Sequence, residues 1–154
     1  MSHVIDTPSL SDFEIASSVL TGFDIVDIQA TGMSNEYLDY VTDHAPAANA
    51  VAVVIANLWA QYGGNLDEIE PAVEAKVWSD PSFSAAARAL TVLWYTGAWY
   101  PDADSAGGTL LSAASYQQGL MWPAVGTKPL GARPGGYASW ALPPASPTVA
   151  RGAR

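Results

Sequence analysis

The segment DADSAGG at 102–108 is the part of this 154-residue chain that most looks able to bind a metal ion. Its alternating acidic side chains match the start of a calcium loop, in which carboxylate oxygens are the ligands. A complete loop also needs an oxygen ligand at its fifth position and a glutamate at its twelfth, where this chain has Ala106 and Ala113. We therefore interpret 102–108 as a solvated loop without calcium.

Histidines and a run of acidic residues are the other candidates for proton transfer or metal binding. His3 and His44 have no clustered partner in the sequence, and His44 is expected at the C-terminal end of a helix, where the helix dipole favours it. The carboxylates at 67–74 are expected on a solvated helix face, because nothing in the sequence buries or opposes them. Neither set predicts a catalytic pair.

Motifs for cofactors and nucleophiles are missing from the sequence. It contains no glycine-rich dinucleotide or Walker motif, and Ser139 lacks the flanking glycines of a nucleophile elbow. It also contains no cysteine, which excludes disulfides, thiolate catalysis, cysteine-bound zinc and iron–sulfur clusters. We therefore expect no catalytic, cofactor-binding or metal-binding residue in this chain.

The charges are distributed unevenly along the chain. The first 75 residues contain twelve acidic residues and no Lys or Arg, whereas the four charged residues after Asp104 are all basic. An acidic body of this kind is a poor partner for nucleic acid or an anionic membrane surface, because both require clustered Lys or Arg. We expect no nucleic-acid partner and no direct membrane insertion.

Two apolar stretches, 45–62 and 81–100, are interpreted as buried core helices rather than membrane spans. The first contains two asparagines and is shorter than the ~20 residues needed to span a bilayer, and the second is interrupted by Arg88. The N-terminal sequence has no basic region followed by an apolar region, so it is not expected to be a signal peptide.

Helical periodicity and capping residues predict an all-α fold, a small irregular domain of about five to six helices. The expected helices are one opened by a capping box of Ser11 and Glu14 and ended by Gly22, one at 36–44, one at 46–62 stopped by Gly63 and Gly64, a short acidic one from Asn65 or Glu70, one from Asp80-Pro81 to Gly97, and one at 111–122 broken by Pro123. Residues 101–109 are expected to form a loop.

The last 32 residues are rich in proline and glycine, which interrupt regular structure. We therefore expect residues 1–122 to form the helical domain and residues 123–154 to form a non-regular, extended docking tail of the same structural unit. The tail also contains Tyr137 and Trp140, aromatic residues with a polar group of the kind that anchors protein interfaces.

The other aromatic residues gather near the ends of the two last expected helices. A core position is the favoured interpretation for Trp94 and Trp122, although Trp122 is also counted among the residues expected to bind a partner. The complete set of expected partner-binding residues is Trp99, Tyr116, Trp122, Lys128, Arg133, Tyr137 and Trp140. Arg133 and Lys128 are expected at the rim of the interface, where charge mainly affects the association rate.

Four segments carry a resemblance to a known family: SSVLTGF (17–23), LWYTGAWY (93–100), SYQQGLMW (115–122) and KPLGARPGGYASWALPPA (128–145). Their order and spacing resemble the small subunit of membrane-associated, FAD-dependent sugar and polyol dehydrogenases, with the sorbitol dehydrogenase small-subunit family as the nearest. The segments extend over most of the chain, and the C-terminal pattern of tyrosine, tryptophan, glycine and proline is the most specific of them.

The resemblance implies a non-catalytic accessory subunit that helps a large flavoprotein subunit to mature, with FAD in that partner and none in this chain. It also implies a cytochrome c subunit in the same complex and a location on the periplasmic side of the inner membrane. Members of the family commonly supply a twin-arginine export signal, which this sequence does not contain. A cytoplasmic location is the alternative.

Two other functions remain open from the sequence alone. One is a stand-alone module that binds carbohydrate or protein through its aromatic residues. The other is an enzyme that uses Asp102 or Asp104.

Overall fold

Helices account for most of the structure, a computed structural model that describes residues 7–101 and 106–129. Its elements, in chain order, are α1 (Leu10–Thr21), α2 (Ile25–Ala30), α3 (Ser34–His44), α4 (Pro46–Gln61), α5 (Leu66–Val73), the π-helical turn η1 (Glu74–Trp78), α6 (Pro81–Thr96), β1 (Ala98–Trp99), β2 (Thr109–Leu110), α7 (Ala113–Gln117) and α8 (Met121–Ala124). The predicted all-α class is confirmed. The predicted tail, residues 123–154, lies largely outside the described residues, and its expected boundary at 122/123 falls inside α8.

The first helix begins two residues earlier than its sequence predicted. Ser9 is the N-cap, and its hydroxyl accepts a hydrogen bond from the backbone amide of Asp12 at 3.1 Å. The expected cap at Ser11 is therefore wrong. Its expected partner Glu14 is buried and accepts instead from Gln29 of α2. Gly22 ends α1 in the left-handed conformation, as predicted.

The two long apolar helices form where the sequence predicted them. Proline occupies the first turn of both α4 and α6, where its missing amide has no intrahelical partner in any case. The Asp80 carboxylate caps α6 by accepting from the amides of Ser82 and Phe83 at 2.8 and 3.1 Å. Among the described helices, none is long and apolar enough to cross a membrane.

A π-helical turn follows α5 and was not predicted. Pro71 lies inside α5, and the helix widens from Glu74 to Trp78 before it ends. At the end of the turn, the Glu74 carbonyl accepts hydrogen bonds from both the amide and the hydroxyl of Ser79. Ile69, Val73 and Val77 are buried, so the widened turn keeps one apolar face directed at the core.

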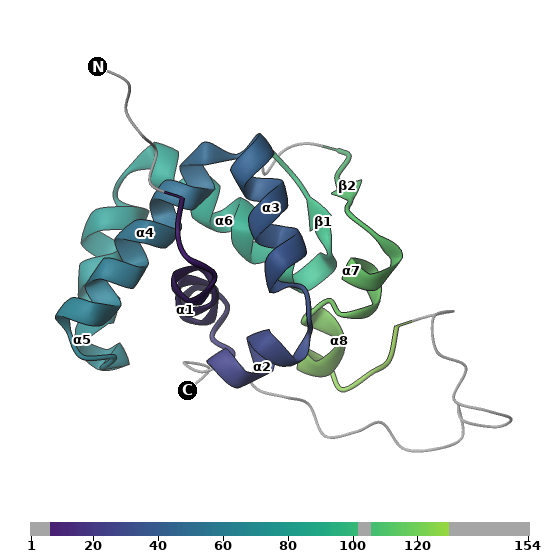
Figure 1. Cartoon of the computed structure of the whole chain (residues 1–154), viewed down its shortest axis with the longest axis horizontal. Coiled ribbons are helices and arrows are strands. Elements are labelled where there is room, and N and C mark those ends of the chain that lie inside the picture. Colours follow the sequence, from purple (N-terminus) through teal and green to yellow (C-terminus); the bar gives the residue numbers. More distant parts are fainter. Residues whose placement is uncertain (1–6, 102–105, 130–154) are drawn as a thin grey trace, which may run out of the picture.

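Helices α1, α3, α4 and α6 enclose the core. Figure 1 shows α1 end-on in the middle, with α4 and α5 on one side and the hairpin, α7 and α8 on the other. Trp94 of α6 lies at the centre, 1% exposed, with ring centroids 6.2 Å from Phe13 of α1 and 4.7 Å from Tyr37 of α3. Small buried side chains, such as Ala16 and Ala52, allow the helices to approach one another closely.

The chain after α6 is less regular than expected. Strands β1 and β2 form a two-stranded antiparallel sheet in which Ala98 pairs with Leu110 and Trp99 with Thr109, so Thr109 of the predicted loop at 101–109 belongs to a strand. Residues 102–105 of that loop lie outside the described residues. The single helix expected at 111–122 is two short helices, α7 and α8, separated at residues 118–120. Pro123 lies within α8 and does not break it, because a four-residue helix needs no amide from its third residue.

Candidate functional site

Three of the four segments that carry the family resemblance meet at the C-terminal end of α6. Tyr95 is the residue that joins two of them, because its hydroxyl donates to the carbonyl of Thr21 at 2.9 Å and its ring lies 6.0 Å from that of Phe23. The third segment approaches the Tyr95 backbone, where a Cβ added to Gly119 would lie 2.7 Å from the Tyr95 carbonyl oxygen. We call this meeting point of residues 17–23, 93–100 and 115–122 the junction.

Gly97 sets the geometry of the junction. Its φ of 75° is in the left-handed region that favours glycine, and a Cβ at this position would overlap the backbone carbonyl of Ser115. The Gly97 carbonyl accepts two hydrogen bonds, from the Leu111 amide at 3.2 Å and from the Ser115 hydroxyl at 2.8 Å. A residue with a side chain would prevent this close approach, so glycine is required here.

Ser115 has two structural roles in the junction. Its hydroxyl also accepts from the Ser112 amide at 3.0 Å, while the Ser112 hydroxyl accepts from the Ser115 amide, which completes a capping box for α7. Ser115 is fully buried. It therefore starts α7 and fixes that helix to the end of α6 at the same time.

Residues 116–122 position α8 and the start of the predicted tail. The Leu120 amide donates to the Trp94 carbonyl at 3.0 Å, and the Trp122 indole donates to the Tyr116 carbonyl at 2.8 Å. The rings of Tyr116 and Trp122 meet edge to face at 5.4 Å, and both side chains are half-buried. The pair thus lies at the surface, just before residues 123–154.

The predicted partner-binding residues fall into three groups. Tyr116 and Trp122 lie together at the surface, and Lys128 is exposed a few residues later. Trp99 is only 8% exposed and its ring lies 5.9 Å from that of Tyr40, so it packs mainly against this chain. Arg133, Tyr137 and Trp140 lie outside the described residues.

Of the two aromatic residues expected in the core, one is there and one is at its edge. Trp94 is buried, as predicted, whereas Trp122 is half-buried.

Two tyrosine hydroxyls near the core have raised pKa values. Burial raises the pKa of the Tyr95 hydroxyl. Burial, with a smaller contribution from the charge of Glu36, also raises the pKa of Tyr37. Both phenols are therefore neutral at physiological pH and can act as hydrogen-bond donors but not as bases.

The candidate metal and acid–base residues form no cluster in the described part of the chain. No group of three His, Asp or Glu residues could hold a metal ion there. The carboxylates at 67–74 are exposed, as predicted, and His44 is the last residue of α3, where its ring stacks on Tyr40 at 4.4 Å. His3, Asp102 and Asp104 lie outside the described residues.

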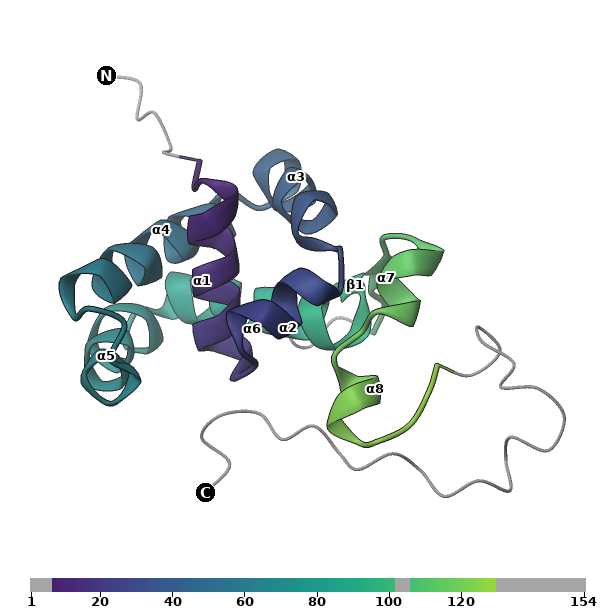
Figure 2. The same cartoon turned by 60° about the horizontal axis from the view of Figure 1, so that its bottom comes forward.

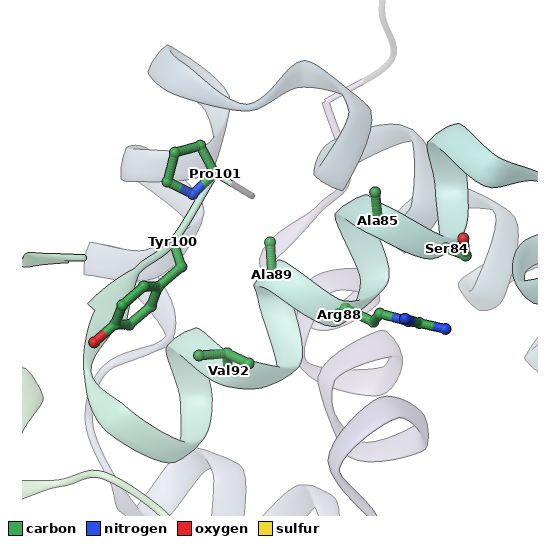
Figure 3. A pocket seen from close by; sticks show the side chains of 7 residues that line it. All are labelled: Ser84, Ala85, Arg88, Ala89, Val92, Tyr100 and Pro101. Carbon is green, nitrogen blue, oxygen red and sulfur yellow. The ribbon is translucent and has the colours of Figure 1, made fainter. Parts of the chain in front are cut away.

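A shallow pocket of about 210 Å³ lies on the outward side of α6 (Figure 3). Tyr100 and Pro101 form one end, and Arg88 extends from the other. Its lining is Ser84, Ala85, Arg88, Ala89, Val92, Tyr100 and Pro101. It contains no carboxylate, histidine or thiol, so these residues supply neither an acid–base pair nor a nucleophile activated by a base.

Sequence reasoning missed the residues that hold the junction together. Thr21, Ser115 and Gly119 all belong to segments quoted for the family resemblance, but their contacts are made to residues distant in the sequence. Ser115 and Gly119 meet the backbone carbonyls of Gly97 and Tyr95, and the carbonyl of Thr21 accepts from the Tyr95 hydroxyl. The one sequence signal for such a contact is a glycine or serine at a position where no turn or helix cap is expected. Gly119, which lies in an expected helix, is the clearest example.

Comparison of the chain with protein-family models, curated proteins and solved structures finds no match. The resemblance to sugar and polyol dehydrogenase small subunits therefore stays a prediction from the four segments.

Proposed function

We propose that this chain is a non-catalytic accessory subunit of an FAD-dependent sugar or polyol dehydrogenase. In this proposal it stabilises the large flavoprotein subunit during maturation, and FAD is bound by that partner. A cytochrome c subunit is a further member of the proposed complex. The C-terminal tail, together with Tyr116, Trp122 and Lys128, forms the docking surface.

The observation that carries the proposal is the position of the Tyr116–Trp122 pair. It is half-buried, and its backbone is fixed to the end of α6 through Leu120 and Ser115. The chain continues from this pair into a segment with Tyr137 and Trp140. Aromatic residues on a rigid support are the usual anchors of protein interfaces, because they bury a large area at a small cost in side-chain entropy.

The aromatic residues of the described chain give less support to a stand-alone carbohydrate-binding module. Each of them is buried or half-buried, and several pair with one another, as Tyr116 does with Trp122 and Phe23 with Tyr95. A sugar platform needs a broad exposed ring face, and contacts within the chain cover part of each of these rings. Carbohydrate binding is therefore the second candidate, and the experiment below separates the two.

The proposal is tested by co-expressing a tagged copy of this chain with a sorbitol dehydrogenase large subunit. We expect a complex that contains FAD and oxidises a polyol with an artificial electron acceptor, whereas the chain purified alone has neither flavin nor activity. Flavin bound to the isolated chain, or polyol oxidation by it, contradicts the proposal. Binding of soluble glucans by the isolated chain, without any complex, supports the carbohydrate module instead.

Trp140→Ala tests the contribution of the tail. Removal of a buried interface tryptophan costs roughly 2 kcal/mol or more, about a 30-fold weaker complex, and should leave the circular dichroism of the isolated chain unchanged. Ser139→Ala, in the same segment but without loss of a ring, is the matched control. If Trp140→Ala unfolds the isolated chain while the yield of complex holds, the tail belongs to the core.

A further inference from the structure

The shallow pocket on α6 lies on a side of the helix that the core does not use. Figure 2 shows α6 passing behind α1, against which it packs. The buried residues of α6 are Ala87, Ala89, Leu90, Leu93 and Trp94. Except for Ala89, none of them lines the pocket, and the other α6 residues of the lining are exposed or half-buried. The pocket therefore opens to solvent and not into the core.

Tyr100 forms one wall of the pocket, and the second strand holds its ring in place. Trp99 pairs with Thr109, so the antiparallel register places Tyr100 opposite Gly108. A Cβ added to Gly108 would overlap the Tyr100 ring, which shows that the ring packs directly on the Gly108 backbone. Gly108 does not have a positive φ, so this close contact accounts for a glycine here. The wall is thus formed before any ligand arrives.

Small side chains on α6 leave the space that the pocket occupies. Ala85 and Ala89 are one helical turn apart, and Val92 and Pro101 complete the apolar lining. An enclosed apolar cavity of ~150 Å³ is large enough to bind benzene, and the volume here is about 210 Å³. Pockets for drug-sized ligands begin at ~300 Å³. The size of the pocket therefore suits a molecule with a single ring.

Arg88 is the only charged residue of the lining, and Figure 3 shows its side chain at the end opposite Tyr100. Among the described residues, its guanidinium has no hydrogen bond or ion pair. Asp80 lies eight positions earlier in the chain, about 12 Å along the helix axis, and is engaged in capping α6. Asp102 and Asp104 lie outside the described residues. A guanidinium without a partner favours an anion, and a carboxylate matches its geometry best.

We propose that this pocket binds a small carboxylic acid with an apolar ring. The ring lies against Tyr100 and Val92, and the carboxylate pairs with Arg88. A short flexible link joins the two parts of the ligand, because Tyr100 and Arg88 stand at opposite ends of the pocket. The lining has no acid–base pair, so the pocket binds its ligand without converting it. This binding is additional to the proposed docking of a partner and does not depend on it.

Titration of the full chain with sodium phenylpropionate, followed by amide NMR shifts, tests the proposal. This probe has one phenyl ring and a two-carbon link to its carboxylate. We expect a Kd of about 1 mM, because the ligand is small and the net charge of −9 opposes an anion at long range. The shifts should concentrate at the amides of Ala85, Arg88, Ala89, Val92 and Tyr100. Phenylpropanol keeps the ring but has no charge, and it should bind about 5-fold more weakly.

Two variants separate the charge of the pocket from its space. Arg88→Gln should weaken binding of the acid about 5-fold and leave the alcohol unchanged, whereas Ala85→Leu fills the pocket and should weaken both at least ~5-fold. Ala85 is exposed and leucine is a good helix former, so the fold is retained. Lys76→Gln, which removes an exposed cation outside the pocket, is the matched control and should change neither.

The same titrations give the results that would overturn the proposal. Equal affinity for the acid and the alcohol, or an Arg88→Gln variant that binds the acid as tightly as the wild type, would show that the pocket does not select a carboxylate. Shifts centred elsewhere, or no saturation by ~20 mM, would show that the pocket is not a binding site. The proposed function stands in either case, because none of these measurements involves the partner.

Discussion

The helical core and the junction are stabilised by different kinds of contact. In the core, Trp94 and Tyr37 meet through their side chains, and apolar burial around α1, α4 and α6 dominates. In the junction, backbone carbonyls of Trp94, Tyr95 and Gly97 receive hydrogen bonds or lie against glycine. The core therefore depends on the size of side chains, whereas the junction depends on the absence of a side chain at two glycines.

This difference explains why the segments of the junction contain specific residue types at fixed positions. A core position accepts several apolar residues of similar volume, so its sequence is loosely determined. A close approach of two backbones accepts glycine alone, and a buried carbonyl requires a donor such as the hydroxyl of Ser115. The residue types of LWYTGAWY and SYQQGLMW thus have a structural cause before any partner is considered.

The largest effect is expected from Trp94→Ala in the core. Removal of the buried indole should lower the free energy of unfolding by about 3–5 kcal/mol, through lost transfer free energy and the cavity that remains. Denaturant unfolding measures this loss. Trp59→Ala, which removes a half-buried indole that contacts Gly64, is the control and should cost less. Equal losses at the two positions would contradict the central role of Trp94.

Gly97→Ala should affect the junction more than the core. We expect a loss of about 2–4 kcal/mol, from the left-handed φ and from overlap with the Ser115 backbone. Gly63→Ala is the matched control, because φ is 59° there and nothing lies within 4 Å of the added Cβ. It should cost about 1 kcal/mol. Hydrogen exchange should show that the amides of Leu111 and Leu120 lose protection first. An equal loss of amide protection over α4 would show that Gly97→Ala affects the core as much as the junction.

Ser115→Ala should have a smaller effect in the same region. It removes the donor to Gly97 and half of the capping box, which together are worth about 1–2 kcal/mol. Ser112→Ala removes only the other half of the box and keeps the contact with Gly97. If the two variants have the same stability, the bond from Ser115 to Gly97 contributes nothing to the junction.

The smallest effect at neutral pH is expected from Tyr37→Phe. The Tyr37 hydroxyl is buried and has no hydrogen-bond partner among the described residues, so its removal should change stability by less than about 1 kcal/mol. Above pH ~10 the unfolded chain releases the tyrosine proton while the folded chain retains it, because burial raises the Tyr37 pKa. The unfolded state then binds fewer protons, and the free energy of unfolding falls as the pH rises.

Unfolding of the wild type and of Tyr37→Phe between pH 9 and ~11.5 measures this effect. The wild type should lose stability more steeply than the variant. Tyr62→Phe, which removes a half-buried phenol at the end of α4, controls for loss of any tyrosine. Identical slopes for the wild type and Tyr37→Phe would show that Tyr37 ionises freely in the folded protein.

The sequence predicted the core better than the junction for a physical reason. The extents of α4 and α6 follow from apolar periodicity, an N-terminal proline and glycines such as Gly97 at or after their ends, all of which act locally. The start of α1 was misassigned because Ser9 and Ser11 both have an acidic residue three positions later. Only tertiary contacts decide between them, since Glu14 is drawn into the interior by Gln29.

The junction could not be predicted in the same way. Strands β1 and β2 have two residues each, too few to show alternation. The break between α7 and α8 includes Gly119, which lies against the Tyr95 carbonyl, a contact between residues 24 positions apart that has no local signal. The widened turn η1 also lacks a local signal beyond Pro71. For the candidate site, the sequence identified the aromatic residues but could not tell that Trp99 is buried while Tyr116 and Trp122 reach the surface.

The bond between the Tyr95 hydroxyl and the Thr21 carbonyl also sets an order of events during translation. Its two residues are 74 positions apart, so at ~5–20 residues per second the second emerges roughly 4–15 s after the first. Helix α1 can dock on α4 during this interval, but its C-terminal end has no α6 to pack against. The junction is therefore the last described region to close on the ribosome, and chaperones have several seconds to bind the uncovered end of α1.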